Sequence, residues 1–337
     1  MNSPLYVSGS PHVHSDESVK KIMWAVVIAL LPALFVAVFY FGLPALMVTV
    51  VSIVSCLFFE FVVQKYFLKG KSTLGNGSAV ITGLLLAFNL PSNLPLHWVV
   101  LGAFVGIVIG KMAFGGLGRN PFNPALVGRV FLLISRPVEM TLWPLPKPIW
   151  SFGVDAVTGP TPLGVMKQLA NEGSVSQYAD YVDPVTFQEM PTYVQMLFGQ
   201  MGGSFGEISC IALLAGAIFL LFRKVITWHI PVSFILSSFL LSGALYLYNP
   251  AYYANPFFHL VTGGLVLGAF FMATDMVTSP SSPWGMIVFG TGCGMLTIVI
   301  RIYGAYPEGV SFAILLMNAA TPLLNKAFKP KRFGEKM

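Results

Sequence analysis

The stretch Asp155-Ala156-Val157-Thr158-Gly159-Pro160-Thr161-Pro162-Leu163-Gly164 lies inside the only long polar segment of the chain, residues 137–204. Glycine and proline dominate it, which predicts a loop or a tight turn. Two hydroxyls, Thr158 and Thr161, bracket the Gly159-Pro160 turn, and Asp155 stands just upstream. Such a turn could present a hydroxyl for modification or ligand binding, although Thr-Gly-Xaa-Thr is also common in ordinary loops. The polar segment divides two strongly apolar halves, and that division decides the fold.

Composition indicates the class of protein. Charged residues make up 9% of the 337 residues and hydrophobic residues 55%, with a mean hydropathy of +0.76. Soluble domains carry about 25% charged residues, so this is an integral membrane protein. The three cysteines, Cys56, Cys210 and Cys293, are isolated in apolar runs. Neither a thiolate cluster nor a disulfide framework is therefore indicated.

Ten hydrophobic runs predict an all-α polytopic membrane protein with about ten transmembrane helices. They cover residues 22–42, 43–63, 77–90, 96–113, 122–135, 205–222, 228–248, 256–274, 284–303 and 308–324. A span needs about 20 residues to cross a hydrocarbon core of ~30 Å. The runs 77–90 and 122–135 are shorter and rich in Gly, Pro or Asn. Such segments are tolerated only inside a helical bundle, where neighbours satisfy the freed backbone groups.

The basic residues predict the orientation. With a cytoplasmic N-terminus, 14 of the 19 Lys and Arg residues lie inside, four lie outside, and Arg129 falls within a span. The net charge of +6 does not indicate a nucleic-acid partner, because most of the cations lie on the predicted inner side of the membrane. The predicted parts are a cytoplasmic arm (1–21), a first membrane repeat (22–136), an extracytoplasmic loop (137–204), a second repeat (205–325) and a basic cytoplasmic tail (326–337). His12 and His14 are expected to be solvated in the arm rather than to bind metal.

The two apolar halves resemble each other. Asn89-Leu90-Pro91 and Asp275–Pro280 each close a span, and the following span ends in a cation, at Gly110-Lys111 and at Ile300-Arg301. Five spans is an odd number, so the second five-helix repeat must be inverted relative to the first. Inverted repeats with broken helices are characteristic of transport folds. Chance similarity between Gly- and Pro-rich membrane segments is the alternative.

Charged residues inside apolar runs are the next signal, since an ion exposed to lipid is costly. Arg129 and Asp275 are expected in the protein interior. The ends of spans hold Lys111, Arg301 and Glu308, and snorkelling to the interface is the simpler interpretation for them. Glu60, about one turn from the inner end of its span, is interpreted in the same way.

Four stretches carry a family resemblance. They are Ser10–Ser15, Gly110–Ala125, Phe271–Val277 and Arg301–Ala313. They resemble the NqrB/RnfD family, over about residues 10–325. The length is nearer to RnfD, the membrane-embedded D component of the ion-translocating Rnf ferredoxin:NAD oxidoreductase complex, than to NqrB of the sodium-pumping NADH:quinone reductase.

The resemblance implies an FMN esterified through its phosphate to a loop threonine. The family motif Asp-Xaa-Xaa-Ser/Thr-Gly-Ala-Thr is matched by Asp155, Thr158, Gly159 and Thr161, which makes Thr161 the attachment residue. Pro160 stands where the family has Ala, and Ala156 where Gly is frequent. Proline removes an amide donor, which could alter how a flavin transferase grips the loop. The family also holds a non-covalent riboflavin, for which no local motif assigns contacts.

The implied role is that of a flavin-carrying membrane subunit of a redox-driven translocase, not catalytic alone, in a prokaryotic cell membrane. Its partners would be the other Rnf subunits (A, B, C, E and G), membrane lipid, and the flavin transferase during maturation; no metal site or catalytic residue is expected. The alternatives are an NqrB-type subunit, a channel or transporter for a small solute without a redox role, and a purely structural scaffold. The loop motif favours the flavin, because a pore has no need of an attachment turn.

Overall fold

The computed structural model describes residues 17–69, 73–147, 158–184, 187 and 189–329. Within these residues five helical segments are long and apolar enough to cross a membrane: 19–68, 96–114, 229–248, 283–303 and 310–327. Three shorter apolar helices, 78–88, 124–135 and 210–222, accompany them. The chain is therefore a polytopic helical membrane protein, as predicted, and each predicted hydrophobic run falls on helical structure.

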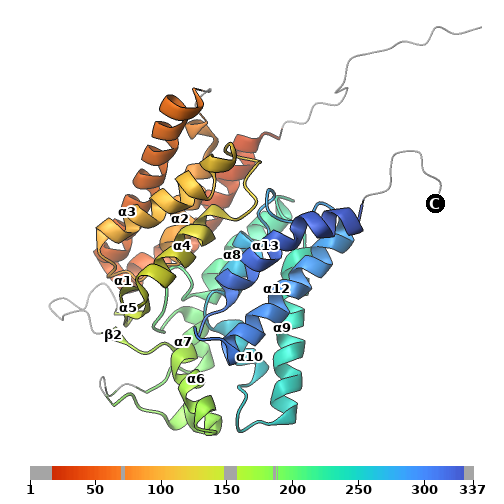
Figure 1. Cartoon of the computed structure of the whole chain (residues 1–337). Coiled ribbons are helices and arrows are strands. Elements are labelled where there is room, and N and C mark those ends of the chain that lie inside the picture. The colour runs from red at the N-terminus through yellow and green to blue at the C-terminus, as the bar shows by residue number, and fades with distance from the viewer. Residues whose placement is uncertain (1–16, 70–72, 148–157, 185–186, 188, 330–337) are drawn as a thin grey trace, which may run out of the picture.

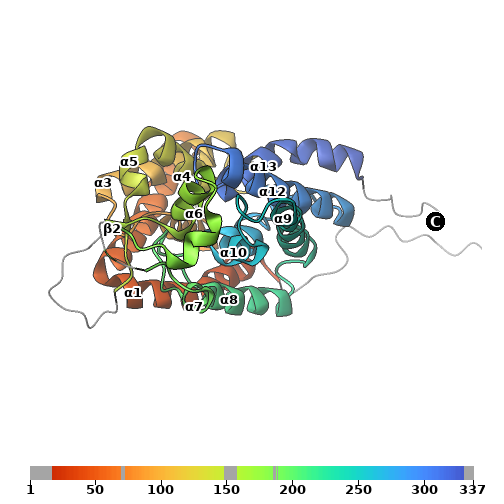
Figure 2. The ribbon, with the colours of Figure 1, turned by 90° about the horizontal axis from the view of Figure 1, so that it is seen from below.

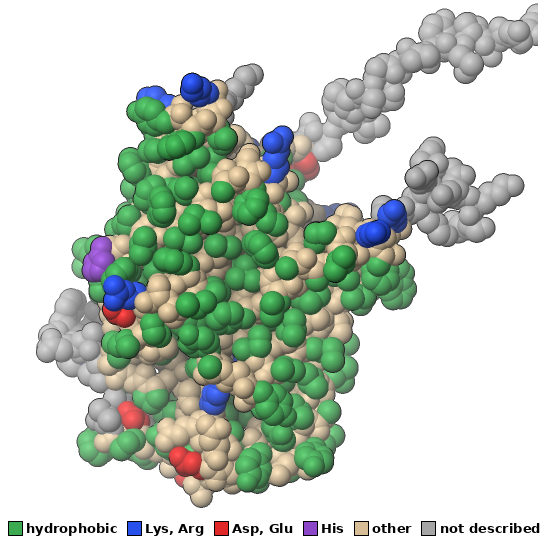
Figure 3. Space-filling model, in the orientation of Figure 1, with side chains coloured by type: hydrophobic (Ala, Val, Ile, Leu, Met, Phe, Trp, Pro, Cys, Tyr) green, Lys and Arg blue, Asp and Glu red, His purple; other side chains and the backbone are tan. Residues whose placement is uncertain are grey.

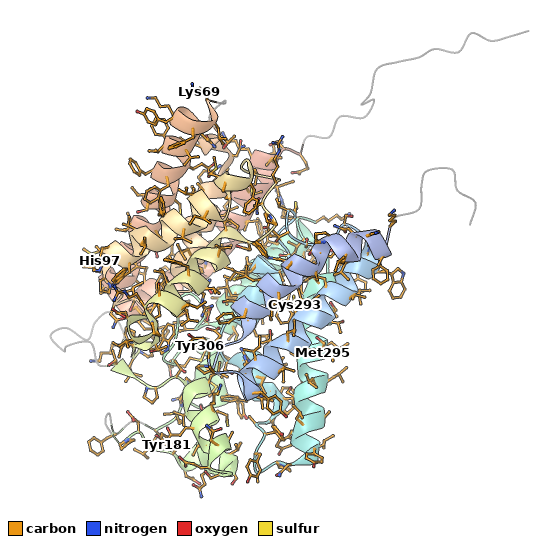
Figure 4. The ribbon with its side chains drawn as sticks, viewed as in Figure 1. Lys69, His97, Tyr181, Cys293, Met295 and Tyr306 are labelled. Atoms are coloured by element: carbon orange, nitrogen blue, oxygen red, sulfur yellow. The ribbon has the colours of Figure 1, made fainter. Side chains whose placement is uncertain are left out.

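The first helical segment is broken in the middle. Helix α1, Val19–Val62, continues as the π-helical turn η1, Val63–Leu68, but Gly42 interrupts it with φ +64° and ψ −148°. Glycine adopts a positive φ without steric cost, and Pro44 follows two residues later. The two arms correspond to the predicted runs 22–42 and 43–63. The start of α1 and Lys69 both lie towards the upper end of the molecule, so the arms run in opposite directions (Figure 1, Figure 4).

The rest of the first half consists of short helices packed on α1. They are η2 Leu74–Asn76, α2 Ser78–Phe88, α3 Leu96–Phe104 with its π-helical continuation η3 Val105–Ile109, η4 Met112–Phe114 and α4 Pro124–Ser135. Helix α4 begins where the sequence favours it, since the Asn123 side chain accepts the Ala125 N–H at 3.1 Å and Pro124 occupies the first turn.

The polar segment folds into small elements at one end of the bundle. They are α5 Pro137–Thr141, β1 Trp143–Pro144, β2 Thr158–Gly159, α6 Pro162–Asn171, η5 Val175–Asp180 and α7 Tyr193–Phe198. Seen from below, α6 lies near the middle of the molecule, whereas α5 and β2 lie over the first half (Figure 2). Helix α6 is thus positioned near the junction of the two halves.

The second half contains a broken helix between longer ones. Its elements are α8 Cys210–Phe222, α9 His229–Tyr248, α10 Pro256–Val261, α11 Leu265–Leu267, η6 Gly268–Met272, α12 Pro283–Tyr303 and α13 Val310–Ala327. The break between α10 and α11 contains Gly263, whose φ is +64°. A buried break frees backbone N–H and C=O groups that must find other partners.

Small residues let the helices approach closely. A Cβ on Gly216 of α8 would overlap the carbonyl oxygen of Ala29, which fixes α8 against α1 and joins the halves. Gly294 of α12 faces α9 in the same way, since a Cβ there would overlap the Ser237 hydroxyl. Close backbone approach at small residues is the usual basis of helix association in lipid.

Charge is distributed unevenly between the two ends. On the face shown in Figure 3, Lys and Arg gather mainly at the upper end, Asp and Glu mainly at the lower end, and hydrophobic side chains cover the middle. Tyr181 of the polar segment and Lys69 mark opposite ends (Figure 4). Ten spans, inverted repeats and the direction of insertion stay predictions.

Candidate functional site

The attachment turn predicted from the sequence joins a short strand to a helix. Thr158 and Gly159 form β2, which pairs antiparallel with β1 so that Trp143 lies opposite Gly159 and Pro144 opposite Thr158. Pro160 is exposed, and Thr161 follows as the N-cap of α6. Asp155 lies outside the described residues. The structure thus places Thr158 and Thr161 in different elements, three residues apart.

Thr161 is suited to carrying an anion. Its Oγ1 accepts the Gly164 N–H at 3.1 Å, and its side chain is half-buried. The N-terminus of a helix presents unsatisfied N–H groups and a partial positive charge, which stabilise a phosphate. A phosphodiester at Thr161 would lie at this end of α6.

In the sequence, Lys167 is a candidate cation for such an anion, with Lys147 a weaker one, but the Lys167 side chain points elsewhere. Its Nζ donates to the carbonyl of Gly304 and, at 3.3 Å, to the carbonyl of Tyr306. Tyr306 lies close to α6 (Figure 4). Burial lowers the pKa of the Lys167 ammonium. That expectation was wrong, because two loop carbonyls take the ammonium and tie α6 to the second half.

Beneath Thr161 lies a cavity of about 50 Å³, which we call the outer cavity. Thr161, Glu207 and Glu308 line it, together with Trp143, Pro162, Leu163, Met201, Gly202, Gly203, Ser204, Ile208, Thr262, Gly263 and Pro307. The cavity therefore connects the attachment turn, the break between α10 and α11, and two carboxylates.

Those carboxylates belong to an ion cluster centred on Arg129 of α4. Its Nη1 donates to Oε1 of Glu207 at 3.2 Å, to Ser311 Oγ at 2.8 Å and to Oδ1 of Asn89, and its Nη2 donates to Glu308. The guanidinium is 5% exposed. Arg129 thus lies in the interior, as predicted, and connects segments from both halves.

The same cluster holds the broken helix. Oε1 of Glu308 accepts the N–H of Gly264 at 2.7 Å, before the first turn of α11. Arg301 donates to the carbonyls of His259 at 2.7 Å and Thr262 at 2.9 Å, at the end of α10. An acid at a helix start and a cation at a helix end both complement the backbone dipoles. We call Asn89, Arg129, Glu207, Arg301, Glu308 and Ser311 the outer cluster.

A second ion cluster lies towards the other end, within the first half. Lys111 Nζ is 2.6 Å from Oε2 of Glu60 and 2.7 Å from Ser78 Oγ. Oε1 of Glu60 accepts from Thr73 Oγ1 at 2.9 Å and Gln64 Nε2 at 3.2 Å. We call these five residues the inner cluster.

The snorkelling interpretation was therefore wrong for these ions. Lys111 is 2% exposed, Glu60 0% and Arg301 3%, and Glu308 is bound to Arg129. Each has a buried partner, so none needs to reach the interface.

The inner cluster borders a cavity of about 90 Å³, the inner cavity, between the two halves. Its polar lining residues are Ser78, Thr82, Lys111, Asn120, Asn123, Thr274 and Asp275, and its apolar ones include Leu85, Phe270 and Phe271. Oδ1 of Asn120 is buried without a hydrogen-bond partner among the described residues. Asp275 thus faces an interior space, as predicted, and an unsatisfied amide oxygen suggests a ligand that donates a hydrogen bond.

Comparison with known proteins decides the family. A model of the NQR2, RnfD, RnfE family matches residues 6–334. The chain belongs to this family.

Curated members of the family cover nearly the whole chain. The D subunit of the proton-translocating ferredoxin:NAD(+) oxidoreductase complex of Clostridium ljungdahlii is 45% identical over 97% of this chain and 96% of its own. The D subunit of the Na(+)-translocating ferredoxin:NAD(+) oxidoreductase complex of Acetobacterium woodii is 42% identical over 98% and 95%. The D subunit of the ion-translocating oxidoreductase complex of Pectobacterium carotovorum is 37% identical over 98% and 99%.

Sequence reasoning missed Glu207, Asn120 and Ser78. Glu207 is a lone acid between Gly206 and Ile208 at the start of an apolar run, which could have placed it among the intramembrane charges. Asn120 lies in the quoted Gly110–Ala125 stretch, but nothing local shows that its oxygen lacks a partner. Ser78 carries no signal beyond its short apolar helix.

Proposed function

We propose that this chain is the D subunit of an ion-translocating ferredoxin:NAD oxidoreductase and carries flavin within that redox-driven translocase. Its three quoted relatives are named as D subunits of ion-translocating oxidoreductase complexes, two of them with ferredoxin and NAD as substrates. The observation that carries the flavin assignment is the position of Thr161, at a helix N-terminus and on the wall of a cavity between the polar segment and the second half.

The covalent group would be FMN, attached through its phosphate to Thr161. The half-buried hydroxyl and the N-terminal end of α6 suit a phosphodiester, and the outer cavity lies next to it. A bound flavin supplies one- and two-electron transfer chemistry. The protein would orient it through β2 and α6 and shield it with Trp143 and Met201.

A non-covalent riboflavin is proposed to bind at the inner cavity. The walls combine apolar side chains with amide and hydroxyl groups, as expected of a site for a flat, neutral, polar-edged ring. Asn120 and Asp275 would bind its polar edge, and Phe270 and Phe271 would bound its apolar part. Because Lys111 also lines this cavity, its ammonium would favour added negative charge there.

The proposed architecture has ten spans in two inverted five-helix repeats, 22–136 and 205–325, with loop 137–204 outside the cell membrane and both termini in the cytoplasm. The basic side chains at one end of the molecule support this direction (Figure 3). The other Rnf subunits (A, B, C, E and G), and a flavin transferase acting on the loop, would be the partners.

Cysteine labelling tests the direction. Ser176 in the loop and Thr227 in the turn between α8 and α9 are both exposed, and the three native cysteines are buried. In intact cells an impermeant thiol reagent should label Ser176→Cys but not Thr227→Cys, which should react only after lysis. The reverse result would overturn the topology.

The flavin is tested by in-gel fluorescence and peptide mass spectrometry after co-expression with the transferase. An FMN-sized mass increment is expected on the peptide that contains Thr161. Thr161→Ala should abolish the fluorescence, whereas Thr158→Ser, the matched control in β2, should keep it. A fluorescent Thr161→Ala protein would show that the site assignment is wrong.

Two other functions are kept as outcomes of the same test. An NqrB-type subunit of a sodium-pumping NADH:quinone reductase would also fluoresce, but its complex would reduce quinone instead of NAD. A channel or transporter for a small solute would show flux without flavin. Pro160 would then be the residue to examine first, because it departs from the family motif.

A further inference from the structure

Glu207 and Glu308 meet at the wall of the outer cavity although 101 positions separate them in sequence. Both bind the one guanidinium of Arg129, and their side chains are 4% and 16% exposed. A Cβ built on Gly264 would lie 2.5 Å from Oε1 of Glu207 and 2.9 Å from Oε1 of Glu308. The two carboxylates therefore share one small space over the same backbone atom.

The charges around this pair nearly balance. Arg129 from α4 contacts both acids, and Arg301 from α12 lies beside Gly263, with its Nη2 2.9 Å from the position of a Cβ there. His259 of α10 offers Arg301 only its carbonyl, and Lys167 of α6 is taken by loop carbonyls. Two carboxylates this close resist being ionised together, while the two arginines favour it. One proton on the pair thus changes the cluster from neutral to cationic.

The outer cavity has polar space beside the pair. The Ser204 hydroxyl lines it, is 3% exposed and lies beside the Glu207 carboxylate. The outer cavity shares Pro162, Met201 and Gly202 with a larger hollow of about 360 Å³, which Asp183 and Glu189 also line. The two hollows therefore share part of their walls.

We propose that Glu207 and Glu308 form a redox-linked proton site that takes up one proton when the group attached at Thr161 gains an electron pair. This inference rests on the proposed function, which supplies a flavin at Thr161 and electrons from reduced ferredoxin. In the step, an O–H bond of a hydronium ion at the loop surface breaks and one carboxyl O–H bond forms. The added proton offsets negative charge beside the phosphodiester, and it leaves when the electrons leave.

The test is the pH dependence of the midpoint potential of the covalent flavin in the purified complex. For a two-electron couple, one extra proton adds about 29.6 mV per pH unit to the slope. The midpoint potential of the wild type is expected to fall more steeply with pH than that of the Glu207→Gln/Glu308→Gln double variant, by up to this amount. Glu139→Gln, which changes a partly exposed ion pair, should keep the wild-type slope.

The possible failures are distinguishable. A wild-type protein without covalent flavin would overturn the proposed function and this inference together. A flavin with equal slopes in the wild type and the double variant would overturn the inference alone.

A second measurement needs no variant. Infrared difference spectra of the wild-type complex should show a protonated-carboxyl C=O band that appears on reduction and shifts in D₂O. Its absence would also overturn the proton site.

Discussion

The inner and outer clusters bury the same kinds of charge in different ways. The inner cluster pairs one ammonium with one carboxylate, satisfies both with neutral partners, and draws all five residues from the first half. The outer cluster sets the guanidinium of Arg129 against two carboxylates, gives that of Arg301 to backbone carbonyls, and uses residues that precede and follow the polar loop. The inner cluster therefore holds together elements of the first half alone, whereas the outer cluster forms only when both halves are assembled.

Buried ion pairs of either kind need not raise stability over an apolar core, but removing one partner is costly. The inner cluster would leave one unpaired charge after such a loss, and the outer cluster would leave two. The comparison therefore predicts unequal effects of equal substitutions.

Arg129→Met is expected to have the largest effect. It leaves Glu207 and Glu308 without their shared cation, which should cost more than the about 3–5 kcal/mol of a single broken buried pair. The measurement is the thermal loss of the monodisperse peak in detergent, with Arg129→Lys as the control that keeps the charge. Wild-type stability in Arg129→Met would show that the acids need no cation.

Lys111→Met should cost about 3–5 kcal/mol, since it leaves Glu60 charged and buried. Ser78, Thr73 and Gln64 stay in place, so the fold of the second half should be preserved. The double variant Glu60→Gln/Lys111→Met should recover part of the loss, because neither charge remains. A double variant less stable than Lys111→Met would contradict the pairing.

Gly264→Ala should cost about 1–3 kcal/mol through overpacking. Its new Cβ would meet both carboxylates of the outer cluster, while a Cβ on Gly75 would meet nothing within 4 Å. Gly75→Ala is thus the matched control, and both variants are compared in the same thermal assay. Equal effects would show that the outer cluster adapts to the methyl group.

Arg136→Gln should change stability least, by less than about 1 kcal/mol. Its ion pair with Glu139 is 3.9 Å long and partly exposed, and its guanidinium also stacks on Trp98 at 4.1 Å from the ring centroid. A loss as large as that of Lys111→Met would remove the distinction between buried and exposed pairs.

Hydrophobic runs were sufficient to locate the helices, because the period and length of apolar residues respond directly to the lipid environment. The same reasoning placed Arg129 in the interior. It failed for Lys111 and Arg301, because a cation at the end of a span looks the same in sequence whether it reaches water or a partner. Glu60 and Lys111 lie 51 residues apart, and only tertiary packing reveals their contact.

The attachment turn was predictable as a turn, since glycine and proline restrict the local backbone. Its surroundings were not. The outer cavity combines Thr161 with Glu207 and Glu308, which no local pattern connects. Lys167 was misjudged because sequence proximity to Thr161 says nothing about which way a side chain on α6 points.

Hydrogen bonds join the loop to the bundle on both sides of Thr161 in the sequence. The Lys147 N–H donates to the carbonyl of Tyr40 at 2.9 Å, the Val175 N–H donates to that of Ala251 at 3.1 Å, and Lys167 holds α6 to the segment before α13. A flavin attached at Thr161, as proposed, would therefore be held in one place. Its electron partners would have to approach it, so any change of distance during turnover would be made by a neighbouring subunit.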